Sequence, residues 1–134
     1  MQKKLKEIIF KYFPEANMDI GKWQEVIKNP SRTPSIPHLF NTIEYFVAYF
    51  SNNDSLNLSF VLYEKEEAIG IMPLMVHKDE SNNWILSSNG TDIVEPIFKK
   101  SLVGISISNL FFLFSELRST FFLVKYFPAN PPEG

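Results

Sequence analysis

The sequence contains no cysteine and no long uninterrupted apolar segment. Without cysteine there is no disulfide framework and no thiolate chemistry. The most apolar stretch, residues 102–114, carries Ser and Asn and is too short to span a bilayer. The basic start of the chain is not followed by a small-residue cleavage site, which argues against a signal peptide. We therefore expect a soluble cytoplasmic protein with no membrane span.

Charge of one sign is also scarce, because the formal net charge is only −2. No general field therefore attracts nucleic acid. The aromatic residues are not interleaved with lysines, as they would be on a platform for single strands. The motifs G-x-S-x-G, the Walker loop and G-x-G-x-x-G are missing. His38 and His77 lie far apart and lack carboxylates at metal-ligand spacing, so we expect no metal site.

Aromatic residues are what the chain has in quantity, with 13 Phe, five Tyr and two Trp among 134 residues. Each aromatic side chain buries a large apolar area, so the chain can build a substantial core. The length suits one domain, which we place at residues 1–127. Residues 128–134 are rich in proline and are expected to form a tail or linker.

A hairpin is the centre of the predicted fold. Residues 56–63 alternate apolar and polar side chains, which is the period of a half-buried strand. A charged turn at residues 64–67 leads to a return strand over residues 68–76. Pro73 is expected at a bulge, strand end or unpaired edge, and Gly70 at a bulge or a close backbone approach. A third antiparallel strand follows at residues 84–88.

Helices are predicted both before and after this meander in the chain. Apolar residues recur at helical spacing in residues 2–13, in residues 19–29 after a possible Asp19 cap, and in residues 35–50. A further helix is expected from about Ser106, apolar on nearly all sides. Residues 120–127 are continuously apolar and predict a strand that is parallel to a neighbour. The predicted fold is α+β, in the order α-α-β-β-β-α-β.

Three motifs in this order resemble the N-terminal half of FemAB-like and CelD-like proteins of the GNAT (N-acyltransferase) superfamily. Residues 33–40, following Trp23, are similar to a helix start in those proteins. Residues 60–74 are similar to their hairpin, and residues 86–98 to the loop that follows their third strand. The resemblance covers residues 23–127, although Ile93 stands where tyrosine is common in the family.

The resemblance implies a GNAT-like mixed sheet and transfer of an acyl group from acyl-CoA or aminoacyl-tRNA to an amine. It implies that Asn89, Thr91, Asp92 and Glu95 contact the acceptor substrate, with Asp92 the main contact. A turn is the simpler reading of Asp92, since residues 89–92 form a good turn sequence. The resemblance assigns no catalytic residue.

The family's acyl-CoA loop, Q/R-x-x-G-x-G/A, does not occur between the third strand and the next helix. We therefore expect this chain to bind no cofactor alone and to be inactive without a second GNAT-like half or a homodimer partner. The partner would pair with the apolar strand at residues 120–127. The alternative is a non-catalytic small domain that acts by protein–protein association through that same strand.

Overall fold

The computed structural model describes residues 2–31, 33–90, 93–99 and 107–121. The chain has an α+β fold. Its helices are α1 (Gln2–Tyr12), α2 (Ile20–Lys28), α3 (Phe40–Tyr49) and α4 (Ile107–Phe121), with single 3₁₀ turns η1 (Ile36–His38) and η2 (Ser51–Asn53). Its strands are β1 (Leu56–Asn57), β2 (Phe60–Glu64), β3 (Glu67–Met72), β4 (Met75–Lys78), β5 (Trp84–Ser87) and β6 (Ile97–Phe98).

The first two helices confirm the sequence pattern. The α1 stripe of Leu5, Ile8 and Ile9 is buried, and the helix ends two residues before Pro14. Asp19 is the N-cap of α2, where its carboxylate accepts the Lys22 N–H at 3.0 Å. That bond satisfies one of the amide groups that a helix start leaves without a partner.

The predicted third helix is divided. Residues 36–38 form η1, and α3 begins only at Phe40, so the helix expected from residue 35 is shorter. Ile43 is the one described α3 residue that is fully buried, whereas Tyr45 and Tyr49 are more than 60% exposed. This helix covers the sheet with a narrower apolar stripe than its sequence predicts.

The hairpin is confirmed, but each of its two arms is broken in the middle. The pairs Leu56–Val76 and Phe60–Met72 share one antiparallel register, so β1 and β2 lie end to end opposite β4 and β3. At the break Ser59 Oγ accepts the Leu74 N–H at 2.9 Å. A side chain therefore replaces one backbone bond of the ladder.

The third strand is broken at the same level into β5, which pairs with β4, and β6, which pairs with β3. The described strands thus form two small antiparallel sheets, β1-β4-β5 and β2-β3-β6. Pro73 lies between β3 and β4 and has no N–H to donate to a third strand there. Gly70 lies where the next strand approaches closely, because a Cβ would be 2.9 Å from Phe98 Cδ1. Both expectations for these two residues are confirmed.

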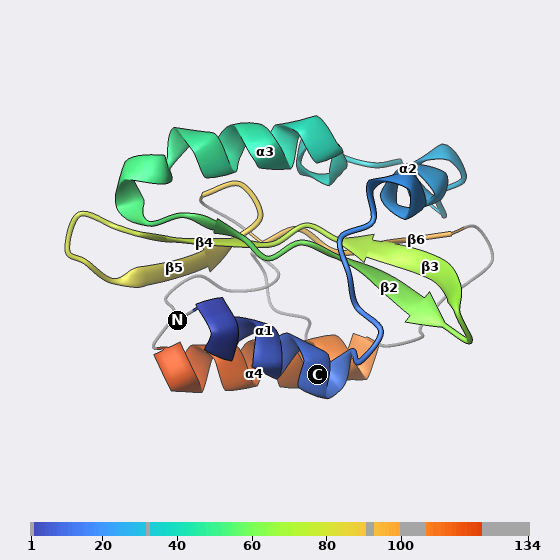
Figure 1. The fold of residues 1–134 in the computed structure, drawn as a ribbon. Coiled ribbons are helices and arrows are strands. Elements are labelled where there is room, and N and C mark those ends of the chain that lie inside the picture. Colours follow the sequence, from blue (N-terminus) through green and yellow to red (C-terminus); the bar gives the residue numbers. More distant parts are fainter. Residues whose placement is uncertain (1, 32, 91–92, 100–106, 122–134) are drawn as a thin grey trace.

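Helices cover both faces of the strands (Figure 1). Helices α1 and α4 form one layer, and α2 and α3 form the other. The α1/α4 layer meets a large apolar core that includes Leu58, Phe60 and Leu62. The α2/α3 layer meets a smaller core built on Trp23 and Val61. This division is what alternation along β2 predicts, since successive side chains point to opposite faces.

The end of the predicted order is corrected. Thr120 and Phe121 belong to α4, so no strand begins at residue 120, and residues 122–127 lie outside the described part. The predicted strand required α4 to end before Thr120, but the helix continues to Phe121. All strand pairs among the described residues are antiparallel, and most of the segment predicted to form the parallel strand lies outside those residues. Phe112 is 59% exposed, so α4 is not buried on nearly all sides.

No helix within the described ranges is long and apolar enough to cross a membrane.

Candidate functional site

The loop that carries the predicted site residues leaves the sheet where all three arms of the meander are interrupted. We call residues 88–96 the 88–96 loop. Its first residue, Ser88, donates its hydroxyl to the Pro73 carbonyl at 2.7 Å and accepts the Val94 N–H at 3.1 Å. The neighbouring Ser87 Oγ accepts the Gly90 N–H at 2.8 Å. Two buried serines therefore hold both ends of the loop against the break.

His38 fixes the far end of the loop from the α2/α3 layer. Its side chain is fully buried, and its Nδ1 accepts the Ser35 N–H at 2.9 Å. Its Nε2 is 2.6 Å from the Glu95 carbonyl, which can only accept, so Nε2 carries the proton. The Trp23 indole donates to the His38 carbonyl at 2.9 Å. This chain of bonds requires the neutral Nε2–H tautomer and places the Glu95 backbone.

Packing pins the middle of the loop to both layers. Gly90 has φ +96, and a Cβ there would overlap the Phe50 ring, so only glycine fits this conformation and this space. Phe50 itself stacks on His77, with ring centroids 4.1 Å apart. On the other side, Ile93 is buried in the α1/α4 core.

The structure places two of the four predicted acceptor residues. Asn89 is half-buried beside Gly90, and the Glu95 side chain is exposed while its backbone is held by His38. Thr91 and Asp92 lie outside the described residues. The sequence resemblance did not identify His38 or the two serines that position this loop.

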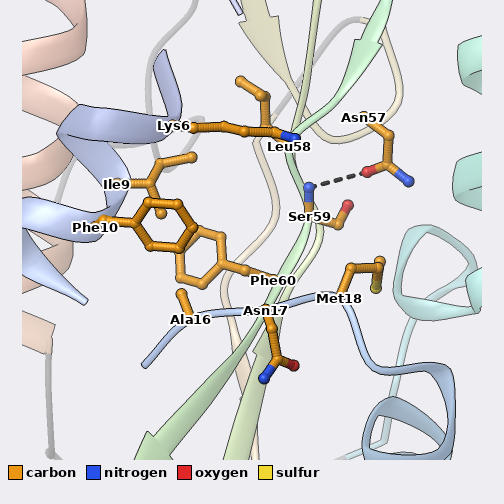
Figure 2. Close-up of a pocket in the computed structure, with 10 residues that line it drawn as sticks. All are labelled: Lys6, Ile9, Phe10, Ala16, Asn17, Met18, Asn57, Leu58, Ser59 and Phe60. Carbon is orange, nitrogen blue, oxygen red and sulfur yellow. Dashed lines mark hydrogen bonds between the residues drawn. The ribbon is translucent and has the colours of Figure 1, made fainter. Parts of the chain in front are cut away.

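A separate cleft opens at the edge of the sheet, on the β1–β2 side (Figure 2). It has a volume of about 160 Å³. Its walls come from α1, from the segment that joins α1 to α2, and from the strand break, and the lining residues are Lys6, Ile9, Phe10, Ala16, Asn17, Met18, Asn57, Leu58, Ser59 and Phe60. Sequence reasoning missed it, because its walls come from segments that lie far apart in the chain.

A further cluster of charged and polar side chains joins α1 to α4. The Glu116 carboxylate accepts from Lys11 Nζ at 2.7 Å and from the Tyr12 hydroxyl at 2.6 Å. These bonds lower the pKa of Glu116, and the same carboxylate raises the pKa of Lys11 and of Tyr12. The three groups join two helices at the surface and belong to neither site, so we assign them a structural role.

Within the described residues no group of three or more His, Asp or Glu side chains could hold a metal ion. His77 is buried rather than at the surface, and it packs against Phe50.

Comparison with known proteins found no match: no family model matches the sequence, and neither a curated protein nor a solved structure matches the chain.

Proposed function

We propose that this chain is the N-terminal half of an N-acyltransferase and supplies the acceptor side of its cleft. The acyl donor would be acyl-CoA or aminoacyl-tRNA, and the acceptor an amine. A second GNAT-like half, or a homodimer partner, would bind the donor. The motif resemblance supplies the reaction class, and the structure supplies the support described next.

The observation that supports the proposal best is the way the 88–96 loop is held. The Ser87 hydroxyl of β5 accepts the Gly90 N–H, the Ser88 hydroxyl accepts the Val94 N–H, and the His38 ring of η1 donates to the Glu95 carbonyl. Transfer to an amine depends largely on holding the acceptor in a reactive geometry. A loop with a fixed backbone and an outward carboxylate suits that task better than a mobile turn does.

In this reaction the N-terminal half would only need to bind and orient the amine. The amine nitrogen attacks the carbonyl carbon of the acyl donor, the thiol or alcohol leaves, and a base takes the proton that the amine loses. Asn89, Thr91, Asp92 and Glu95 would bind and orient the amine. The donor's carbonyl and its leaving group would be held by the other half.

The test uses the natural gene product, incubated with acetyl-CoA and a panel of amines, with free thiol as the readout. Asp92→Ala is expected to lower kcat/KM about tenfold or more while leaving the far-UV circular dichroism unchanged. Glu66→Gln, in the exposed β2–β3 turn, is the matched control and should leave kcat/KM unchanged. Wild-type turnover in Asp92→Ala would remove the assignment of that residue.

A negative result with acetyl-CoA is followed by the same panel with aminoacyl-tRNA, scored as loss of the aminoacyl ester. No amine-dependent turnover with either donor class would contradict the proposal. Amine-dependent turnover with either donor also separates the proposal from the association-only alternative, which predicts none.

A further inference from the structure

The cleft at the sheet edge lies beside an isolated bridge on the side of β2 that faces away from β3. There the Asn17 carbonyl accepts the Val61 N–H at 2.7 Å as the chain crosses from one helical layer to the other. Beyond this bridge the edge at residues 57–60 is not paired with that segment and forms the back wall of the cleft. Helix α1 supplies the opposite wall. Figure 2 shows Phe10 beside Phe60, and Lys6 extending from α1 toward Leu58.

Both asparagine side chains of the lining accept hydrogen bonds through their amide oxygens. Asn57 Oδ1 accepts the Ser59 N–H at 2.9 Å. Asn17 Oδ1 accepts the Tyr63 hydroxyl at 3.0 Å and the Asp19 N–H at 3.2 Å. These bonds hold the two asparagine side chains in the walls of the cleft.

The lining carries one positive charge and no negative charge. Lys6 is its only ionisable residue, and no carboxylate is among the residues that line the cleft. Lys11, Lys78 and Lys99 pair with carboxylates, but Lys6 makes no ion pair with any of the residues that the structure describes. A cation beside an apolar floor favours a ligand with an anionic end and an apolar body.

We propose that this cleft binds a short apolar carboxylic acid. The carboxylate meets Lys6 Nζ, and the aliphatic tail lies among Ile9, Phe10 and Phe60. The volume of about 160 Å³ corresponds to roughly five water molecules at about 30 Å³ each, which suits an acid of about four to six carbons. This site is distinct from the 88–96 loop and does not depend on the acyltransferase proposal.

The test is titration of the ¹⁵N-labelled chain with hexanoate, followed by amide chemical shifts. Saturable shifts are expected at Ala16, Asn17 and residues 57–60, with a dissociation constant on the order of 1 mM. Hexylamine and hexanol have the same tail without the anion and are expected to bind at least tenfold more weakly. Hexanoate that shifts none of these amides, or hexylamine that binds equally well, would overturn the proposal.

Three variants separate the charge of Lys6 from the fold of α1. Lys6→Met keeps the length of the side chain and should weaken hexanoate binding at least tenfold, whereas Lys6→Arg should retain it. Lys4→Met removes an exposed charge of the same helix outside the cleft and should change nothing. Wild-type binding in Lys6→Met, with its circular dichroism intact, would rule out the carboxylate site.

Discussion

The two helical layers hold the same strands by different means. The α1/α4 layer has a continuous apolar core, in which Leu5, Leu113 and Leu117 are fully buried. The α2/α3 layer has a smaller apolar core, and it includes directional bonds from Trp23 to the His38 carbonyl and from His38 to the Glu95 carbonyl of the loop. Apolar contact is not directional, but a hydrogen bond is. We infer that the first layer stabilises the sheet and the second positions the 88–96 loop.

The largest expected effect comes from the α1/α4 core. Leu113→Ala removes a fully buried side chain and should lower the free energy of unfolding by about 2–5 kcal/mol. The adjacent Phe112 is mostly exposed, so Phe112→Ala should cost little. Urea denaturation of both variants measures the difference, and equal costs would contradict the assignment of the two faces of α4.

Gly90→Ala should come next, at about 2–4 kcal/mol, because it combines positive-φ strain with overlap of the Phe50 ring. In a Phe50→Ala background the overlap is gone, so the same change should cost less. A double-mutant cycle measured by denaturation isolates that difference. A cost for Gly90→Ala that is the same in both backgrounds would show that Phe50 does not confine the loop.

Trp23→Phe tests the directional links of the α2/α3 layer at a smaller scale. The ring keeps most of its bulk, but the His38 carbonyl loses its indole donor, which should cost about 1–3 kcal/mol. If the layer positions the loop, amide shifts should spread to Glu95 and Val94 and leave α4 unchanged. Shifts confined to α2 would argue against that role.

The smallest effect is expected from Glu116→Gln, which disrupts the surface link between α1 and α4. The folded-state pKa of Glu116 is lowered, so its stabilisation is full above the unfolded pKa and is lost as the pH falls through the folded value. The raised pKa of Lys11 gives the opposite limit, a loss as the pH rises through its folded value. Thermal unfolding from acid to alkaline pH should show a wild-type advantage that is greatest near neutral pH and shrinks in high salt.

Much of the fold follows from local sequence signals. The α1 stripe, the Asp19 cap and the hairpin reflect side-chain patterns within short segments, and each is confirmed. The breaks in the strands were only partly predictable. Pro73 indicated one of these breaks in the sequence. The bond from the Leu74 N–H to Ser59 Oγ could not be predicted, because the two residues are 15 positions apart in the chain.

The site was less predictable for a related reason. The 88–96 loop was recognised by its motif, yet the group that fixes its end, His38, lies 57 residues earlier in the chain. The residues around His38 do not distinguish a buried histidine that bonds both Ser35 and Glu95 from an ordinary histidine in the first turn of a helix. The cleft likewise forms only when α1 and the strand edge come together, so no single segment of sequence encodes it.

Hydrogen exchange at two backbone amides tests the central claim, that the 88–96 loop is held in place, most directly. The Gly90 and Val94 amides donate to Ser87 and Ser88, and we predict that both exchange at least tenfold more slowly than the Glu66 amide in the exposed β2–β3 turn. Exchange of Gly90 and Val94 as fast as that of Glu66 would show a loop that is not held, and would contradict the account.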